Sequence, residues 1–437
     1  DYSTSTGGIQ VRDYSRLLPY LKAGLYSDVN AKFEGKDAGL WHVGDIRPKD
    51  VHITLDAVLQ TRLQDALAEY AKQNFNDTKW NKLRMSVVVL DGANGDMLAS
   101  ANYPLPDYVM LKNAPNVYEK VEKNQESNWK AYTDMDLGLV RATAPGSTAK
   151  VISAIAGLRK IGVDAANPEL DDYYYDIDPI QKVGLEPTGR VTMRDAIVKS
   201  SNCYFINLIN DHNVYDSLAY VYRTVGVNIN GSSPYILNYN TYNPNTHWEA
   251  KVINQASGAT TAYKNYIKKY RNIKDPRMNK HEAWWWVWGQ GKMAATPLAM
   301  ARVASIVGNY GSMPVTRFVL DSAKVSVPVI TYAEAERLNE FMKEEAVVKK
   351  FTNANVGGKT GTAERILYID NKVKKPHDGW FICFIENSRI KKNGQVYTAP
   401  LGVAVRLERL GSGMSDKAVD VTRDVVLEVL GELGYLQ

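Results

Sequence analysis

The sequence predicts an α+β fold in which an antiparallel sheet is covered by helices. The last hundred residues carry the clearest signal, because three strand patterns follow one another and are closed by a helix pattern. Strands that are neighbours in the chain favour antiparallel pairing, and such a sheet is covered by helices on its apolar side. A composition of 45% hydrophobic and 23% charged residues supplies enough apolar side chain for a sizeable core.

The individual elements are expected in the following order. Apolar residues at helical spacing predict a helix between Val51 and Tyr70, followed by a strand at 86–90 and a turn at 91–95. Further helices are expected at 147–158, 193–209, 297–307 and 332–342. The closing strands are expected at 359–368, 380–386 and 401–407, before a helix at 416–433 whose apolar residues share one face. Segments 102–136 and 228–245 are polar and are expected to be irregular.

The 437 residues are more than one average domain needs. Residues 1–50 show weak periodicity and are interpreted as a linker or the remnant of an N-terminal module, whereas 51–437 are interpreted as one folded domain. No apolar run approaches the roughly 18 residues that cross a bilayer, and no signal peptide is visible. The chain begins with Asp1, so we expect a fragment whose targeting or anchoring segment is missing.

Composition argues against several functional classes. The net charge of +5 is spread along the chain, apart from a modest cluster at 264–271 that is typical of a solvated face, so nucleic-acid binding is not expected. The six histidines form no metal-binding pattern, and no glycine-rich nucleotide motif occurs, so no metal or cofactor is expected. Cys203 and Cys383 lie in apolar segments and are expected to be buried free thiols.

Three short motifs carry the functional signal: Ala144–Lys150 (APGSTAK), Ser200–Asn202 (SSN) and Gly358–Thr362 (GKTGT). Each motif is weak alone, because Ser-x-x-Lys also occurs at Ser127 and Ser388 and Ser-x-Asn also occurs at Ser100. Context separates them, since only Ser147 opens an apolar helix, while Ser127 and Ser388 lie in charged segments.

A lysine three residues after a serine at the start of a helix shares its face. A serine hydroxyl is a poor nucleophile until a neighbouring base takes its proton, and a lysine can do so when burial and nearby cations lower its pKa. The pair Ser147 and Lys150 therefore predicts nucleophilic catalysis. Purely structural interpretations also exist: a helix cap for Ser147, a polar helix face for 200–202 and a tight turn into a strand at Gly361.

In this order the three motifs resemble the signature of penicillin-binding proteins and serine β-lactamases. Other segments resemble the transpeptidase domain of the penicillin-binding proteins, and the similarity extends from about Val51 to the C-terminus. These segments are 53–60, 88–95, 101–104, 191–196, 289–302 and 379–381. The resemblance implies the penicillin-binding-protein transpeptidase (β-lactamase-like) fold, with a five-stranded antiparallel sheet flanked by helices. Since no glycosyltransferase domain is visible, the monofunctional class B type is favoured.

The resemblance also implies roles in acyl transfer. Ser147 would attack the penultimate D-Ala carbonyl of a stem peptide, Lys150 would take its proton, Ser200 would relay a proton to the leaving amine, and Asn202 would bind the substrate amide. Lys359 would raise the local positive potential and orient Ser200. Thr360 and Thr362, with Gly361 between them, would bind the terminal carboxylate of the substrate or of a β-lactam. The backbone N–H groups of Ser147 and Thr362 would form the oxyanion hole.

By the same resemblance, the enzyme would be a D-Ala-D-Ala transpeptidase with a carboxypeptidase side activity. It would act outside the cytoplasmic membrane on peptidoglycan stem peptides, be acylated by β-lactams and work with a membrane glycan polymerase. The alternatives are a serine β-lactamase, for which no water-activating Glu can be placed in the sequence, and a penicillin-sensing receptor domain. Departures from the family pattern are Ala144, Ala149 and the aromatic segment 262–288, whose Trp284, Trp285, Trp286 and Trp288 favour a packed cluster over a glycan platform.

Overall fold

The computed structural model describes residues 52–436 with several gaps. The gaps are 76–82, 105–135, 140, 163–167, 173–175, 179–180, 183–188, 228–279, 292, 321–323, 365–366, 370–371, 375, 393 and 411–414. The proposed N-terminal module at 1–50, most of segment 102–136, the loops at 228–245 and the basic cluster at 264–271 lie outside the described residues.

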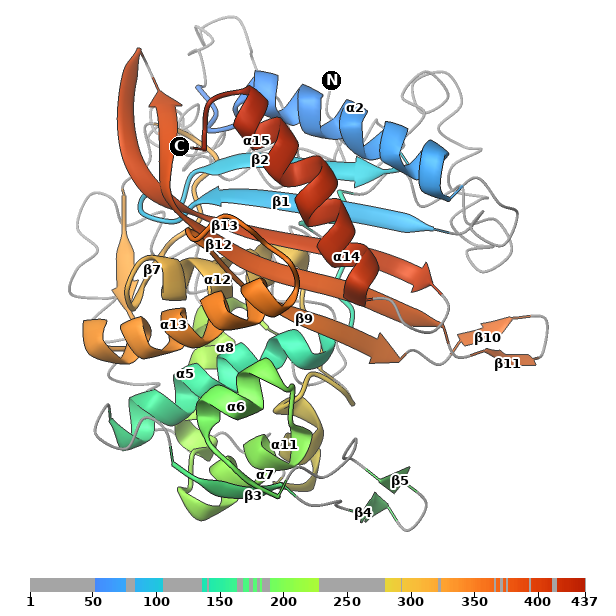
Figure 1. Cartoon of the computed structure of the whole chain (residues 1–437), viewed down its shortest axis with the longest axis vertical. Helices are drawn as coiled ribbons and strands as arrows, with labels where there is room; N and C mark the ends of the chain where they lie inside the picture. Colours follow the sequence, from blue (N-terminus) through green and yellow to red (C-terminus); the bar gives the residue numbers. More distant parts are fainter. Residues whose placement is uncertain are drawn as a thin grey trace, which may run out of the picture.

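A five-stranded antiparallel sheet forms the centre of the molecule, in the order β2-β1-β13-β12-β9 (Figure 1). Its strands are β1 (Arg84–Asp91), β2 (Met97–Tyr103), β9 (Val356–Glu364), β12 (His377–Lys392) and β13 (Gln395–Leu410). The hairpin β12–β13 occupies the middle of the sheet, and β9 is an edge strand whose one neighbour in the sheet is β12. This arrangement confirms the predicted α+β class and the antiparallel sheet.

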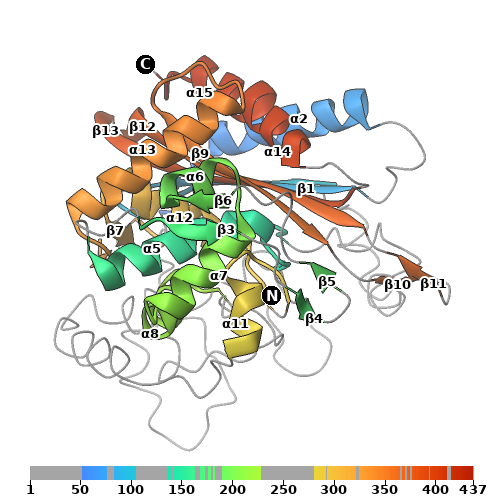
Figure 2. The ribbon, with the colours of Figure 1, turned by 60° about the horizontal axis from the view of Figure 1, so that its bottom comes forward.

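Helices cover both faces of this sheet, and its strands are therefore buried on both sides. Val87 and Val89 of β1 face a layer made of α2 (Ala57–Asn74) and the C-terminal helix, whereas Val88 and Leu90 face the other helices. The C-terminal helix consists of α14 (Ser415–Val421), a π-helical turn η8 (Thr422–Leu427) and α15 (Glu428–Glu432). Figure 2 shows the sheet between this layer and the larger helical region.

The larger helical region holds the remaining long elements. Its helices are α5 (Ala149–Ile161), α6 (Met193–Val198), α7 (Asn202–Asp211), α8 (Tyr215–Val225), α11 (Lys280–Trp286), α12 (Pro297–Gly308) and α13 (Tyr332–Val348). Small two-stranded sheets pair β3 (Leu170–Asp172) with β6 (Gly189–Val191), β4 (Asp176–Asp178) with β5 (Gln181–Lys182), β7 (Ser312–Pro314) with β8 (Ser326–Pro328), and β10 (Leu367–Ile369) with β11 (Lys372–Lys374).

The structure corrects the predicted boundaries in several places. The helix expected at 332–342 extends to Val348. The segment 193–209 is not one helix, because Ser200 has a φ of 61° and separates α6 from α7. β9 ends at Glu364 rather than at 368, where a separate hairpin follows. β12 and β13 extend beyond the predicted 380–386 and 401–407, since their polar distal residues continue the hairpin past a register shift between Ile385 and Ser388.

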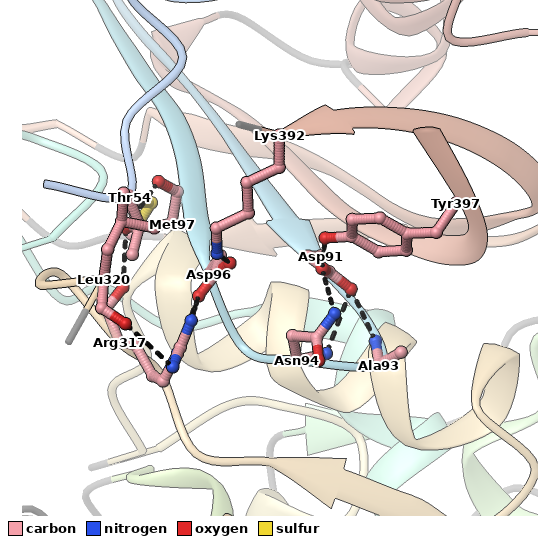
Figure 3. Close-up of polar contacts among 10 residues, drawn as sticks. All are labelled: Thr54, Asp91, Ala93, Asn94, Asp96, Met97, Arg317, Leu320, Lys392 and Tyr397. Carbon is pink, nitrogen blue, oxygen red and sulfur yellow. Dashed lines mark hydrogen bonds and ion pairs between the residues drawn. The ribbon is translucent and has the colours of Figure 1, made fainter. Parts of the chain in front are cut away.

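The β1–β2 turn is fastened to the distal end of the β12–β13 hairpin by two buried aspartates (Figure 3). Asp91 accepts hydrogen bonds from the amides of Ala93 and Asn94, at 2.9 and 3.0 Å, and from the hydroxyl of Tyr397 on β13. Asp96, which is 1% exposed, forms ion pairs with Arg317 and with Lys392 on β12. The sequence predicted the turn at 91–95 but not these distant partners.

Two expectations about side-chain packing are confirmed. Cys203 and Cys383 are free and buried. Trp286 is buried in the core, while Trp284, Trp285 and Trp288 are partly buried and pack against it. Within the part of the chain that the structure describes, no helix combines the length and the apolar character that crossing a membrane requires.

Candidate active site

Ser147 lies in the short 3-10 turn η5 (Gly146–Thr148), directly before α5. Lys150 is in the first turn of α5 on the same side of the helix, as the spacing of three residues predicts. Its Nζ atom lies 3.0 Å from Ser147 Oγ. Ser147 is partly exposed, whereas Lys150 is completely buried. The structure therefore places a buried amine beside an accessible hydroxyl.

Ser200 joins this pair from the break between α6 and α7. Its positive φ is unusual for a residue other than glycine, and with this conformation both its carbonyl and its hydroxyl reach Lys150. Lys150 Nζ donates to Ser200 Oγ at 2.9 Å and to the Ser200 carbonyl. A neutral amine has two N–H groups and one lone pair. When both N–H groups bind Ser200, the lone pair remains for the proton of Ser147.

The surroundings of Lys150 favour this neutral form. Burial holds the pKa of the Lys150 amine well below its usual value of 10.5, and the positive charge of Lys359 lowers it further. Glu345 and Asp172, both buried, and the thiol of Cys203 act in the opposite direction and raise the pKa. Burial is the largest of these influences, so the net effect lowers the pKa of Lys150, in the direction that a general base needs.

Asn202 is the first residue of α7 and is partly exposed. The start of this helix is fixed by its N-cap Ser201, whose hydroxyl accepts a hydrogen bond from the Tyr204 amide at 3.0 Å. The same hydroxyl donates to the carboxylate of Asp172 on β3. Sequence reasoning missed Asp172, which ties the Ser200–Asn202 motif to a neighbouring strand.

β9 carries the third motif along the open edge of the sheet (Figure 1). Gly361 pairs with Trp380 of β12, and Thr362 pairs with Gly379. The Thr360 amide donates to Glu345 at 2.9 Å rather than to a strand, so this N–H points away from β12. Because the N–H direction alternates along a strand, the Thr362 amide also points to the open edge. There it is available to a molecule bound beside β9.

Glycines allow the nucleophile turn to lie against β9. A Cβ atom added to Gly361 would come within 2.7 Å of the Pro145 carbonyl and 2.8 Å of Thr148 Cγ2, and one added to Gly146 would collide with the Thr362 backbone. Gly146 also has a φ of 56°, in the left-handed region that glycine adopts without strain. These contacts place Gly146, the residue before Ser147, against the Thr362 backbone. The oxyanion hole of Ser147 and Thr362 stays a prediction.

Glu345 of α13 is the second site residue that sequence reasoning missed. Its Oε1 atom accepts hydrogen bonds from Lys359 Nζ at 2.9 Å, from the Thr360 amide at 2.9 Å and from the Thr360 hydroxyl at 2.8 Å. The resemblance implies that Lys359 orients Ser200. In the structure the Lys359 ammonium instead donates its hydrogen bond to Glu345. A signal was available, since Leu338, Met342 and position 345 share the buried face of an amphipathic helix.

The described residues contain no group of three or more His, Cys, Asp or Glu side chains placed to hold a metal ion. The described chemistry is that of a serine hydroxyl, a buried amine beside it and the backbone N–H of Thr362 at the open edge of β9. Such an arrangement defines a serine acyl-transfer site.

Comparison with known proteins agrees with this class. The family described as penicillin binding protein transpeptidase domain matches residues 85–392. The chain therefore belongs to the penicillin-binding protein transpeptidase family, and it is a serine acyltransferase-type enzyme. The match covers all three motifs. A search of curated protein sequences found no match.

Solved structures share the fold at low sequence identity. PBPA from Mycobacterium tuberculosis is 20% identical, with a TM-score of 0.61 over 98% of this chain and 90% of that chain. Its ceftriaxone acyl-enzyme complex is also 20% identical, with a TM-score of 0.57 over 90% of this chain and 81% of that one. A chain of a peptidoglycan synthase complex is 22% identical, with a TM-score of 0.58 over 90% of this chain and 64% of that one.

Proposed function

We propose that this protein is a D,D-transpeptidase that cross-links peptidoglycan stem peptides through an acyl-enzyme at Ser147. The observation that carries this proposal is the triangle of Ser147, Lys150 and Ser200, in which one buried amine contacts both hydroxyl groups. Membership of the transpeptidase family supports the same reaction type. The acyl-enzyme complexes solved for the similar PBPA support a covalent intermediate.

In the first half of the reaction, Lys150 takes the proton of Ser147 as its oxygen attacks the penultimate D-Ala carbonyl. The backbone N–H groups of Ser147 and Thr362 stabilise the oxyanion that forms. Ser200 receives a hydrogen bond from Lys150 and lies between this base and the start of α7, so it is the group proposed to pass the proton to the leaving D-Ala amine. Asn202 binds the substrate amide from the first turn of α7.

Carboxylate recognition is assigned to the strand segment Thr360–Thr362. The Thr360 hydroxyl has a single proton, which it donates to Glu345, so Thr362 is the threonine whose hydroxyl is available for the terminal carboxylate. Lys359 contributes positive charge from a buried position behind this edge. In the second half of the reaction an amine of a neighbouring stem peptide attacks the acyl-enzyme, and the same base accepts its proton. The ester bond to Ser147 then breaks, and Lys150 returns a proton to the Ser147 oxygen.

The first test is acylation by a fluorescent penicillin, followed by intact-protein mass spectrometry. The wild type should gain one penicilloyl group, and Ser147→Ala should gain none. Ser388→Ala is the matched control, because Ser388 opens another Ser-x-x-Lys sequence but donates to the Ile385 carbonyl within β12. This control should be acylated like the wild type. Lack of acylation in the wild type, or labelling of Ser147→Ala, contradicts the proposal.

The second test measures transfer. A donor stem peptide ending in D-Ala-D-Ala, supplied with an acceptor amine, should release one D-Ala and form the cross-linked product. Release of D-Ala without an acceptor would be the carboxypeptidase side reaction. Acylation without either product would favour a penicillin-sensing domain, and turnover of penicillin at many per second would favour a β-lactamase.

We place this reaction on the outer side of the cytoplasmic membrane, because its substrate is the cell-wall stem peptide. The partner proposed for the enzyme is a membrane glycan polymerase, and similarity to a chain of a peptidoglycan synthase complex supports it. Fractionation of the full-length protein tests the location, and recovery from the cytoplasm would contradict it. Co-purification from detergent-solubilised membranes tests the partner.

A further inference from the structure

A single carboxylate oxygen collects three donors at the edge of the site. Oε1 of Glu345 accepts from Lys359 Nζ, from the Thr360 amide and from the Thr360 hydroxyl, all at 2.8–2.9 Å. The Glu345 side chain is 1% exposed and Lys359 is completely buried. Oε2 of Glu345 has no hydrogen-bond partner among the described residues. The hydrogen bonds that the described residues make to this carboxylate therefore all come from β9.

The Glu345 carboxylate provides a hydrogen-bond acceptor for the Thr360 N–H and for the Lys359 ammonium. β9 is an edge strand, so the outward N–H of Thr360 has no neighbouring strand to bind. A buried N–H and a buried ammonium without acceptors each cost free energy comparable to or larger than one hydrogen bond. Glu345 supplies the acceptor for both from α13. It thereby fixes the position of β9 two residues before Thr362, whose amide is assigned to the oxyanion hole.

The charges around the two buried lysines also indicate a role for Glu345. Lys150 and Lys359 are both buried, and each positive charge disfavours the other. Burial lowers the pKa of Lys359, while the charge and the hydrogen bond of Glu345 raise it; Lys349 at the end of α13 lowers it. Around Lys150, Lys359 lowers the pKa, whereas Glu345 of α13, Asp172 of β3 and Cys203 of α7 raise it. Glu345 forms an ion pair with Lys359 at 2.9 Å and acts on Lys150 through its charge.

We propose that Glu345 is a positioning residue for acylation, which holds Lys359 as a cation and fixes the adjacent edge of β9. This inference rests on the proposed function, because it concerns the positive charge of Lys359, which helps to keep Lys150 neutral. Removal of the carboxylate leaves Lys359 without a counter-ion, so Lys359 loses its proton at lower pH. The site then loses the positive charge that the reaction uses.

The test is the pH profile of the second-order rate constant for acylation by a fluorescent penicillin. The profile of the wild type should be bell-shaped, because acylation needs neutral Lys150 and charged Lys359. The rate constant rises with pH as Lys150 loses its proton, and it falls as Lys359 loses its proton. In Glu345→Gln both limbs should move to lower pH, since a negative charge that favoured both ammonium groups is gone. The falling limb should move most, with a loss of at least about tenfold at pH 8 and a smaller loss at pH 6. Glu345→Asp should restore most of the profile.

Glu334→Gln is the matched control. Glu334 is a buried glutamate on the same helix, but it belongs to the capping box with Thr331. This variant should keep the wild-type profile even if its thermal stability falls. A loss of rate in Glu345→Gln that is equal at every pH, with both limbs unmoved, would show a structural role and overturn the proposal.

A second variant keeps the proposal testable if Glu345→Gln does not fold. In Lys359→Arg, with Glu345 retained, the guanidinium stays charged, so the falling limb should be absent up to pH 10. Persistence of that limb would show that Lys359 does not produce it, and the proposal would fail. A wild type that no penicillin acylates at any pH overturns the proposed function and this inference together. A wild type that is acylated, with unmoved limbs in Glu345→Gln, overturns only the inference.

Discussion

The indole Nε1 of Trp380 donates a hydrogen bond to the carbonyl of Ala144 at 3.0 Å and so joins the middle of the sheet to the segment before Ser147. Trp380 is completely buried on β12, opposite Gly361 of β9, and the guanidinium of Arg406 lies 5.3 Å from its ring centre. The nucleophile turn is therefore held from two sides, by Trp380 at Ala144 and by β9 at Gly146.

We expect Trp380→Phe to slow acylation by roughly tenfold, because the turn that carries Ser147 loses an anchor while the ring packing is largely kept. The free energy of unfolding should fall by about 1 kcal/mol, as for one lost hydrogen bond. Trp284→Phe is the control, since its indole donates to Asn210 on α7 at 3.1 Å. An acylation rate unchanged in Trp380→Phe would remove this anchor from the mechanism.

Gly289 also contacts the turn that carries Ser147. It has a φ of 81°, its carbonyl accepts from the Gly146 amide at 2.9 Å, and an added Cβ would collide with the Gly146 backbone. Gly289→Ala should therefore displace Gly146 and Ser147 and reduce acylation by about 100-fold, since small displacements of reacting groups have effects of that size.

The matched control is Gly162→Ala. Gly162 has a φ of 83° but no atoms within 4 Å of an added Cβ, so the variant carries the backbone strain without the collision. It should lose about 1–3 kcal/mol of stability, because its backbone conformation is one that residues other than glycine rarely adopt, and keep the wild-type acylation rate. Equal loss of acylation in both variants would mean that strain alone, and not the contact with Gly146, explains the effect.

Lys150→Met tests how much the buried base lowers the free energy of unfolding. Acylation should fall by about 10²–10⁴-fold, because Ser147 loses its proton acceptor. The free energy of unfolding at pH 7 should rise by ~1 kcal/mol, as often happens when a buried catalytic group is replaced by an apolar one. The pKa of Lys150 is lowered by folding, mainly through burial, so the folded wild type binds fewer protons than the unfolded chain.

The sign of the pH effect follows from this difference. The stability of the wild type should rise with pH between the lowered pKa of folded Lys150 and its ordinary value of 10.5. The advantage of Lys150→Met should therefore be largest at low pH and shrink as the pH rises. Lys160→Met, at an exposed position of the same helix, should change neither stability nor acylation. Chemical denaturation at several pH values measures both variants.

Local pattern was enough to predict the parts of this fold that depend on short-range spacing. Ser147 and Lys150 are three residues apart on one helix, so their contact follows from helix geometry. The two faces of β1 and the buried stripe of the C-terminal helix follow in the same way from apolar periodicity.

The partners that come from distant segments could not be predicted in this way. Glu345 meets Lys359 because α13 folds back along β9, and Asp172 meets Ser201 through the packing of β3 on α7. The left-handed Ser200 was also missed, since its conformation is stabilised by tertiary contacts with Lys150 rather than by local propensity. A glutamate in line with Leu338 and Met342 on the buried face of a helix was the local sign of the Glu345 contact.

The buried ion pairs of Asp96 give a prediction for the end of the sheet remote from the site. The Asp96 side chain is 1% exposed and faces Arg317, which is 3% exposed, and Lys392 at the distal end of β12 (Figure 3). Asp96→Asn keeps the shape but removes the negative charge that pairs with the buried Arg317 and with Lys392. Breaking a buried pair in this way costs about 3–5 kcal/mol, because an uncompensated charge remains out of water.

Urea denaturation should therefore show a large loss for Asp96→Asn, accompanied by an unchanged acylation rate below the unfolding transition. Lys392 and Gly379, the partner of Thr362, lie towards opposite ends of β12, so the site should not sense the change. Asp416→Asn is the control, since Asp416 is 70% exposed and its ion pair with Lys349 should contribute at most about 1 kcal/mol. Equal stability losses in the two variants would mean that the Asp96 contacts are as weak as a surface ion pair and do not fasten the β1–β2 turn to the β12–β13 hairpin.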